Sequence, residues 1–405
     1  MQAAQVIRRL SFDEWGGTET VVWNNSRNLP HFGVESEILA TSALSRPGEE
    51  KVDGQSIRRF PYLYPYFPMT AIRRAALDKK GGNPWVPKLE RYLLKQNFDL
   101  IHCHNLGRIL ELTRRVAEKK RIPYVVSLHG GCTDVPAAEK EELLRPIRGT
   151  FSFGGAFERL FRVRRDALER ADGIICVGEN ELAALKAQYP DKKVLFLPNG
   201  VTPEKYRAET FFDWRGHLGI APDTELILDV SRIDYQKNQL LLIDYAALLK
   251  KRGRKFHLLL IGPVTSEWYG WKINEKIAAE KLGDCVTVIA GLHPDDPRLT
   301  GAYRSADLFI LPSKHEPFGI VVLEAWSAGV PVVGARVGGL AKLIRDSENG
   351  MLFESESLDA LDAACEKMRG CRDAIRAAAG REVSEKYDWN VVAGQLKAFY
   401  EEVSR

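Results

Sequence analysis

The sequence contains no apolar run long enough to cross a bilayer, which would take roughly 18 to 20 residues. Its first residues also lack the continuous apolar stretch of a secretory signal peptide. We therefore expect a cytoplasmic protein. Peripheral contact with the inner face of the cytoplasmic membrane stays an open alternative, because the first 200 residues carry an excess of Lys and Arg within an overall net charge of +4.

Cysteine is scarce and forms no recognisable ligand pattern. The six cysteines include no C-x-x-C pair, and several lie in apolar strand-like runs such as GIICVG. These features are typical of reduced core thiols, so we expect neither a disulfide framework nor a structural metal. His102, Cys103 and His104 suggest zinc at first sight, but alternation along a strand would place the cysteine on the opposite face from the two histidines.

Other absences exclude further classes of function. No G-x-G-x-x-G opens a helix after a strand, which disfavours a dinucleotide-dependent oxidoreductase. No D-x-D motif follows an expected strand, although nucleotide enzymes often hold a metal with one. Basic residues occur in pairs rather than in a long stripe with interleaved aromatics, so we expect no nucleic-acid partner.

Short apolar, β-branched runs alternate with helical patterns along the whole chain. A length of 405 residues suits two domains of roughly 200 residues each. The alternation indicates parallel sheets covered on both faces. We predict two doubly wound α/β domains that face each other across a cleft, at 1–200 and 208–385, with hinges near 199–207 and before the last helix. That last helix, in 386–405, is expected to pack back toward the first domain.

Ligands of open α/β sheets bind beyond the carboxyl ends of the strands. The residues that follow the expected strands are rich in glycine and charge. They are Gly16 to Glu19, His129 to Gly131, Ser231 and Arg232, Gly262 and Pro263, Gly291, and Ser313 to Gly319.

The stretch KHEPFGIVVLEAWSAG, residues 314–329, is the strongest site candidate. Glu324 lies among apolar residues of an expected helix, so it must be exposed or bind a ligand. Gly319 begins that helix, and the free N–H groups of a helix start bind phosphate. Glu316 precedes it. A nucleotide sugar fits this arrangement, with its diphosphate at the helix start and its hydroxyl-bearing groups at the two glutamates.

Arg232 and Lys237 follow the first expected strand of the second half. A departing nucleoside diphosphate develops negative charge, which two cations can stabilise. We therefore expect an enzyme that needs no metal and no cofactor.

Taken together, these motifs resemble the retaining glycosyltransferases of family 4. The resemblance rests on SRIDYQKN, on EPFGIVVLE with its E-x7-E spacing, on the early GGTE, and on PNGV, ADLFILPS, VGGL and ENGMLF. It implies the GT-B fold, in which two Rossmann-like domains bind acceptor and donor. The chain departs from the family's usual pattern at Pro317 and at Gly262-Pro263-Val264.

The resemblance also implies roles in donor binding. Arg232 and Lys237 would hold the donor diphosphate, and Glu324 would bind the ribose hydroxyls. Glu316 would bind the hydroxyls of the donor sugar. The backbone amides that complete this site would be those of Phe318, Gly319, Ile320 and Val321.

In the first domain, the loop at Gly16 and Gly17 would approach the diphosphate closely, because a side chain at Gly17 would collide with it. His129 would lie beside the transferred sugar. The implied catalytic group is therefore Glu316, His129, Arg232 and Lys237.

The implied activity is retaining transfer of a hexosyl residue from a UDP or GDP sugar to a glycan, a lipid-linked glycan or a small acceptor, in polysaccharide or cell-envelope glycan biosynthesis. The sequence offers no evident second carboxylate to act as a nucleophile, so we prefer a front-face reaction. Two alternatives stay open: a nucleotide-sugar epimerase of the same fold, and a catalytically silent subunit that binds sugar nucleotides.

Two stretches of the first half concern the acceptor. Residues 60–69, FPYLYPYFPM, could stack on sugars or form an irregular edge of the sheet. Residues 156–173 place Phe157, Leu160, Phe161 and Leu168 on one face of a helix, with arginines elsewhere. Such a helix could touch anionic lipid, but we favour a helix that simply covers the sheet.

Overall fold

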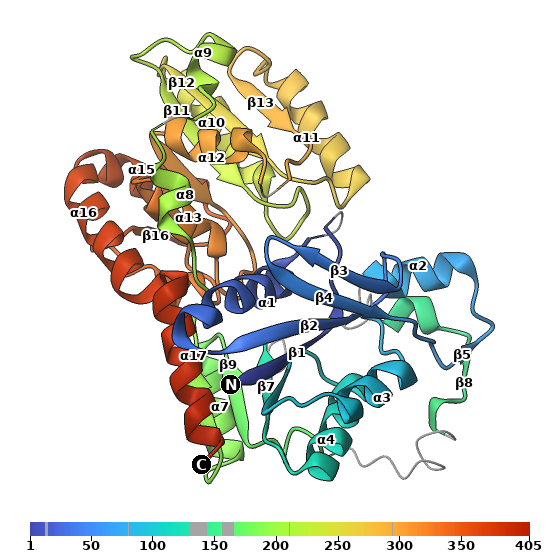
Figure 1. Cartoon of the computed structure of the whole chain (residues 1–405). Helices are drawn as coiled ribbons and strands as arrows, with labels where there is room; N and C mark the ends of the chain where they lie inside the picture. Colours follow the sequence, from blue (N-terminus) through green and yellow to red (C-terminus); the bar gives the residue numbers. More distant parts are fainter. Residues whose placement is uncertain (13–14, 80, 130–143, 156–165, 210, 294) are drawn as a thin grey trace. The chain divides into compact units, whose positions relative to one another are not determined.

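The computed structural model describes the chain apart from residues 13–14, 80, 130–143, 156–165, 210 and 294 (Figure 1). The chain folds into two compact units. Unit 1 contains Met1–Asn199 and Trp389–Arg405, and unit 2 contains Gly200–Asp388. The last helix therefore belongs to the same unit as the start of the chain.

Unit 1 is built on a sheet with the strand order β10-β9-β7-β6-β1-β2-β4-β3. Its described neighbours are parallel except at the edge, where β3 runs antiparallel to β4. The strands are β1 (Gln2–Arg9), β2 (Glu35–Thr41), β3 (Gly48–Val52), β4 (Gln55–Phe60), β6 (Leu100–Cys103), β7 (Tyr124–Leu128), β9 (Gly173–Cys176) and β10 (Lys193–Phe196). A separate ribbon pairs β5 (Tyr66–Phe67) with β8 (Phe151–Ser152).

The described helices of unit 1 connect these strands. They are α1 (Gly17–Asn28), η1 (Leu29–Phe32), α2 (Ala71–Lys79), α3 (Pro87–Lys95), α4 (Arg108–Lys120), η2 (Arg145–Ile147), α7 (Glu179–Gln188) and α17 (Trp389–Val403).

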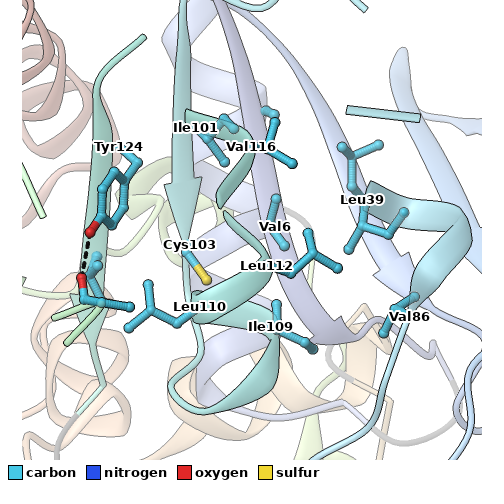
Figure 2. Close-up of a cluster of buried hydrophobic side chains, with 14 of the residues drawn as sticks. Val6, Leu39, Val86, Ile101, Cys103, Ile109, Leu110, Leu112, Val116 and Tyr124 are labelled. Carbon is cyan, nitrogen blue, oxygen red and sulfur yellow. Dashed lines mark hydrogen bonds between the residues drawn. The ribbon is translucent and has the colours of Figure 1, made fainter. Parts of the chain in front are cut away.

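Alternation along the strands divides the core of unit 1 between two faces of the sheet. Val6, Ile101 and Cys103 pack with Leu112 and Val116 of α4 on one face (Figure 2). The opposite face carries Ala3, Leu100, Val125 and Ile175, and α17 covers it with the apolar residues Trp389, Val392, Leu396 and Phe399. This division follows from the period of two along a strand.

Glycine allows α17 to lie close to the sheet. A Cβ atom at Gly173 of β9 would be 2.6 Å from a ring carbon of Phe399 and 2.9 Å from Val403. Any larger residue at that position would push the helix away. The close approach lets the hydroxyl of Tyr400 reach side chains of the sheet itself.

Unit 2 has the strand order β13-β12-β11-β14-β15-β16, which is the 3-2-1-4-5-6 order of a dinucleotide-binding fold. All described neighbours are parallel. The strands are β11 (Glu225–Val230), β12 (Phe256–Ile261), β13 (Val286–Ile289), β14 (Leu308–Leu311), β15 (Val332–Ala335) and β16 (Met351–Phe353).

The described helices of unit 2 are α8 (Pro203–Arg207), α9 (Trp214–Leu218), α10 (Gln239–Lys251), α11 (Glu267–Ala279), α12 (Pro297–Ser305), α13 (Ile320–Ser327), α14 (Leu340–Leu343), α15 (Leu358–Arg369), α16 (Arg372–Glu382) and the π-helical turn η3 (Val383–Tyr387). Alternate residues of β11 enter separate cores: Leu226 and Leu228 join one, and Ile227 joins the other. The sheet is thus buried on both faces.

The strand order reverses between β11 and β14, which follow one another in space but not in the chain. At such a switch point, the loops after the two strands diverge and leave room for a ligand. The loop after β11 contains Arg232 and Lys237, and the loop after β14 contains Glu316. The fold therefore brings the predicted residues to one edge of the sheet.

The predicted fold class of two doubly wound α/β domains is confirmed by the parallel sheet in each unit. Among the described helices, none has both the length and the apolar character needed to span a membrane. The described cysteines are free thiols: Cys103, Cys176, Cys285, Cys365 and Cys371. Most of the predicted helix in 156–173, including Phe157, Leu160 and Phe161, lies outside the described residues, as do Gly130, Gly131 and Cys132.

Candidate functional site

The start of α13 is built around Gly319. This residue has φ 96° and ψ 54°, a left-handed conformation that favours glycine. A Cβ atom there would also lie 2.7 Å from a methyl group of Leu340. The helix then begins at Ile320, and within the described part of the chain the N–H groups of Ile320 and Val321 donate to no acceptor. Such groups attract an anion.

A pair of glycines supports the loop before α13. The N–H of Gly339 donates to the carbonyl oxygen of Glu316 at 2.7 Å. A Cβ atom at Gly338 would lie 2.5 Å from that same oxygen, and one at Gly339 would lie 2.1 Å from the carbonyl oxygen of Pro317. The VGGL motif is therefore needed for backbone to pack on backbone, and it fixes the position of Glu316.

Lys237 and Glu316 form an ion pair, with Nζ 2.5 Å from Oε2. Their side chains are only 13% and 12% exposed, so water screens the pair little. The Asp234 carboxylate accepts from the N–H of Lys237 at 3.2 Å, which shapes the loop after β11. The N–H of Lys314 donates to the carbonyl oxygen of Gln236 at 2.7 Å and joins the two loops.

Arg232 lies nearby in sequence but is far more exposed, at 46% of its side chain. Its Nη2 atom is 3.3 Å from an Asp234 oxygen and 3.4 Å from the Gln236 side-chain oxygen. Both contacts are long and solvated, so they hold the guanidinium weakly. Arg232 can therefore turn toward an anionic ligand at little cost.

Glu324 has a protein partner that sequence reasoning did not find. The hydroxyl of Tyr303, on α12, donates to Oε2 of Glu324 at 2.6 Å. Burial raises the pKa of the Glu324 carboxyl above its ordinary value, while hydrogen bonds from Tyr303 and from Tyr206, on α8, oppose the rise. Exposure and a ligand were the two expected ways to accommodate this carboxylate. The structure adds a third, which leaves part of its hydrogen-bonding capacity for a ligand.

Asp229 is a second group that sequence reasoning missed. It lies on β11, is 1% exposed, and accepts at Oδ2 from the hydroxyl of Ser231 at 2.8 Å. Gln239 links this pair to the chain by donating to the Ser231 hydroxyl at 2.7 Å and to the Arg232 carbonyl oxygen at 2.9 Å. Burial raises the pKa of Asp229 to about 7. The signal was available, because alternation in ELILDV points Asp229 inward with Ile227.

In unit 1, α1 begins at Gly17 with Gly16 as its N-cap residue. A Cβ atom at Gly16 would lie 2.9 Å from an oxygen of Glu19, which pairs with Arg9 at 2.8 Å. A Cβ atom at Gly17 would meet nothing within 4 Å. Packing inside the described chain therefore does not demand glycine at position 17, and the space above it is open.

His129 follows β7 and is partly buried. Its Nε2 atom lies 3.0 Å from Nδ1 of His104, and their rings stack with centroids 5.2 Å apart. Burial lowers the pKa of His129 to about 4, so the imidazole is neutral near pH 7. His104, which follows β6, was not among the predicted site residues.

The structure thus places the predicted residues in two groups. Within unit 2, the residues predicted to bind the donor gather at the switch point: Arg232, Lys237, Glu316, Phe318, Gly319, Ile320, Val321 and, further along α13, Glu324. Within unit 1, Gly16 and Gly17 follow β1, and His129 follows β7.

Two family models match the chain. Residues 15–205 match the model described as Glycosyltransferase Family 4, and residues 210–382 match the model described as Glycosyl transferases group 1. The two matches correspond closely to the first part of unit 1 and to unit 2.

Comparisons with individual proteins agree with the two family models. The chain is 26% identical to an uncharacterized glycosyltransferase of Methanocaldococcus jannaschii over 93% of this chain and 91% of that one. It is 29% identical to a D-inositol 3-phosphate glycosyltransferase of Nocardia farcinica over 95% and 84% of the two chains. A solved structure of Anabaena HepE with UDP-glucose superposes with a TM-score of 0.68 at 19% identity, over 99% and 100% of the chains.

The identity to the Anabaena structure is too low to show more than a shared fold, which is GT-B. The two family models, one for each half, support a more specific assignment. The chain belongs to the family 4 glycosyltransferases of GT-B type.

Proposed function

We propose that this glycosyltransferase transfers a hexosyl residue from a nucleotide-diphosphate sugar to a hydroxyl acceptor with retention of the anomeric configuration. The acceptor would be a glycan, a lipid-linked glycan or a small molecule of polysaccharide or cell-envelope glycan biosynthesis. One observation carries the proposal: at the switch point, the Lys237–Glu316 pair joins the loop after β11 to the loop that leads to the start of α13.

The cationic groups fit a diphosphate. Arg232 is weakly held, and the N–H groups of Ile320 and Val321 have no acceptor within the described residues. A helix start and two cations together favour a ligand with two or more negative charges. The Anabaena enzyme of the same fold was solved with UDP-glucose, which supports a nucleotide-sugar donor here.

The Lys237–Glu316 pair would be remodelled by the donor. A diphosphate beside Nζ of Lys237 competes with the glutamate for the same cation. Glu316 can then accept from hydroxyl groups of the donor sugar, as the family resemblance implies. Without donor, the pair keeps both side chains in place and limits the cost of ordering them on binding. Glu324, held by the hydroxyls of Tyr303 and Tyr206, would bind the ribose hydroxyls.

The proposed reaction occurs on one face of the sugar. The bond between the anomeric carbon and the donor phosphate oxygen breaks, and the acceptor oxygen bonds to the same face. The acceptor proton passes to the leaving phosphate oxygen. Arg232 and Lys237 stabilise the negative charge of the departing diphosphate, so we predict activity without a divalent metal. In unit 1, Gly17 would face the diphosphate and His129 the transferred sugar.

A thermal-shift screen with EDTA present tests the donor assignment. UDP, GDP, ADP and their hexose conjugates are added to the wild type and to the Arg232→Ala and Glu324→Ala variants. A nucleotide at 100 times its dissociation constant should stabilise the wild type by about 2.7 kcal/mol, and neither variant to that extent. Arg254→Ala is the matched control, because Arg254 is an exposed arginine of unit 2 that pairs with Glu366 away from the switch point.

The outcomes separate the candidate functions. A stabilising nucleotide names the base for an acceptor screen, in which NMR of the product gives the anomeric configuration. An inverted product would contradict the retaining mechanism. Epimerised donor without transfer would favour an epimerase, and binding without turnover would favour a silent subunit. If no nucleotide binds, or if both variants bind normally, the donor-site proposal fails. Sedimentation with anionic vesicles tests peripheral membrane contact.

A further inference from the structure

Six polar side chains form a connected cluster on the face of the unit 1 sheet that α17 covers. We call Gln5, His102, His104, Ser127, His129 and Tyr400 the histidine network. Alternation places Gln5 with Ala3 on β1, His102 with Leu100 on β6 and Ser127 with Val125 on β7, all on one face. Strand register sets Gln5 directly beside His102.

Most of this network is removed from solvent. Gln5, His102 and Tyr400 are 0% exposed, and His104 is 3% exposed. Only His129, after the end of β7, is partly exposed. The network thus runs from the interface with α17 to the edge of the sheet where ligands bind. The donor roles assigned above use His129 alone, so the other five residues have no function yet.

The hydrogen bonds form an unbroken chain. Gln5 Nε2 donates to the Tyr400 hydroxyl at 3.0 Å, and Gln5 Oε1 lies 2.8 Å from Nε2 of His104. Nδ1 of His104 is 3.0 Å from Nε2 of His129. On the other branch, His102 lies 2.7 Å from the Tyr400 hydroxyl at Nδ1 and 2.7 Å from the Ser127 hydroxyl at Nε2.

This order of contacts determines where the protons lie. Gln5 Oε1 can only accept, so Nε2 of His104 must carry a proton and donate it. His104 is neutral because it is buried among neutral groups, so its Nδ1 is bare and accepts. His129 must then donate from Nε2. A neutral imidazole has only one N–H, and Nδ1 of His129 is therefore a bare acceptor.

Tyr400 maintains this proton order. Its hydroxyl accepts from Gln5 and so directs its own proton to Nδ1 of His102. If the Gln5 amide reversed, the Tyr400 hydroxyl would have to donate to Oε1 of Gln5 and accept from Nδ1 of His102, so the proton order on both branches depends on Tyr400. With the amide reversed, Nε2 of Gln5 would donate to His104, His104 would donate to His129, and Nδ1 of His129 would become a donor. Through Tyr400, the last helix is thus coupled to the proton order at the edge of the sheet.

We infer that Gln5, His104 and Tyr400 are positioning residues that hold His129 as the Nε2–H tautomer and present its bare Nδ1 to the ligand. Among the described residues, Nδ1 of His129 has no hydrogen-bond partner of its own. The identity of the ligand rests on the proposed function, in which it is a hydroxyl of the transferred sugar. A neutral acceptor suits that place, because a cationic imidazolium would repel an oxocarbenium-like transition state.

The tautomer can be measured directly by NMR on the full-length protein labelled with ¹⁵N-histidine, near pH 7.5. Long-range ¹H–¹⁵N correlations distinguish a protonated from a bare ring nitrogen, and loss of signals in His129→Gln assigns the residue. The wild type should show His129 with a bare Nδ1 and a protonated Nε2. A protonated Nδ1, or a cationic ring, in the wild type overturns the inference, and this measurement needs no folded variant of the network.

Tyr400→Phe tests the control by α17. It should convert part or all of the His129 population to the Nδ1–H tautomer, because the Gln5 amide is released. Tyr124→Phe is the matched control, since Tyr124 is also a buried tyrosine of unit 1 and donates one hydrogen bond, to the Ala167 carbonyl oxygen at 2.6 Å. It should leave His129 unchanged. Equal spectra for wild type and Tyr400→Phe would refute the role of Tyr400.

Activity measurements distinguish a failure of the positioning role from a failure of the proposed function. With UDP-glucose as the probe, Tyr400→Phe should lower kcat about tenfold with an unchanged KM for donor, whereas Tyr124→Phe should retain kcat. If the tautomer is as stated but neither UDP-glucose nor another hexose conjugate binds or turns over, the proposed donor fails and the positioning role stands. If donor turns over but His129 is the other tautomer, the positioning role fails alone.

Discussion

Beside the Arg9–Glu19 ion pair, unit 1 presents glycines and neutral histidines at the carboxyl ends of its strands, whereas unit 2 presents arginine, lysine and glutamate. Both edges belong to parallel sheets with the same kind of switch point. In unit 1 the reversal lies at β1 and β6, which precede Gly17 and His104, and in unit 2 it lies at β11 and β14. The fold therefore supplies the place for a ligand, and the side chains decide which part of the ligand each edge can meet.

The depth at which the side chains are buried explains why the histidines of unit 1 are neutral. The histidine network extends into the sheet, where solvation of a cation is lost, and burial lowers the pKa of His102 to about 3. The same rule operates in unit 2, where the deeply buried Asp229 has its pKa raised to about 7. Lys237 and Glu316, by contrast, form an ion pair in which each is the other's partner. Charge survives at these edges only where it is paired or partly solvated.

The largest expected effect comes from breaking the ion pair of unit 2. Lys237→Met should lower kcat/KM about 10²- to 10³-fold, because a cation beside the leaving group is lost. It should also lower the free energy of unfolding by about 3 kcal/mol, because Glu316 stays buried without its partner. Enzyme kinetics and denaturant unfolding measure the two effects.

A double variant separates the effect on activity from the effect on stability. Lys237→Met with Glu316→Gln should recover most of the stability and none of the activity. Arg252→Met, which breaks a more exposed pair with Asp362, should change stability by less than about 1 kcal/mol. If the double variant is as unstable as Lys237→Met alone, the pair does not hold the two loops as described.

The next largest effect is a loss of stability that should differ between two glycines, one near the carboxyl edge of each sheet. A Cβ atom at Gly262 of unit 2 would lie 1.7 Å from the Ser231 carbonyl oxygen, so Gly262→Ala should destabilise the protein by about 3 kcal/mol or more. A Cβ atom at Gly17 of unit 1 meets nothing within 4 Å, so Gly17→Ala should change stability by no more than about 0.5 kcal/mol.

Gly17→Ala should nevertheless weaken donor binding, because the donor would occupy that open space. Thermal unfolding with and without nucleotide measures both properties for each variant. Unaltered nucleotide binding by a stable Gly17→Ala protein would remove Gly17 from the donor site and leave it as an ordinary helix start.

The smallest effect is a pH dependence of opposite sign in the two units. Burial lowers the pKa of His129 from 6.5 to about 4, so between these values the unfolded chain binds a proton that the folded chain does not. Stability should therefore fall as pH drops through this window, by about 1 to 3 kcal/mol. Asp229 has its pKa raised from 3.8 to about 7, so its contribution is present at low pH and is lost as pH rises toward 7.

Denaturant unfolding between pH 4 and pH 8 tests both signs. Asp229→Asn keeps the shape of the side chain and removes its titration, so this variant should gain stability relative to the wild type near pH 8 and lose that advantage near pH 4. His129→Gln should reduce the loss of stability in acid. An Asp229→Asn difference that does not vary with pH would show that Asp229 titrates normally.

Much of this molecule could be predicted from local pattern. Apolar runs such as ELILDV that alternate with helical patterns indicated parallel strands buried on both faces, and Gly319 before an apolar run indicated the start of α13. The residues after the strands predicted the edge of unit 2 at which the structure pairs Lys237 with Glu316. These features depend on neighbours within a few positions, so a single sequence is sufficient for them.

Side-chain partners were less predictable. Tyr303 as the partner of Glu324 and His104 as the partner of His129 required contacts between separate elements, across 21 and 25 residues. No local periodicity specifies which of several buried polar groups will meet. The VGGL motif was recognised, but its reason was not, since the contact it makes is with the backbone of Glu316 on another loop.

By itself, then, the sequence determined the parallel α/β architecture and which residues follow the strands at the carboxyl edge of each sheet, because strand and helix periods are properties of short segments. Only the tertiary structure decided the charge and proton states at those edges. Lys237 meets Glu316 across 79 residues, and Tyr400 meets Gln5 across 395. The state of a buried polar group depends on its partner and on its depth, and both are set only when distant segments pack together.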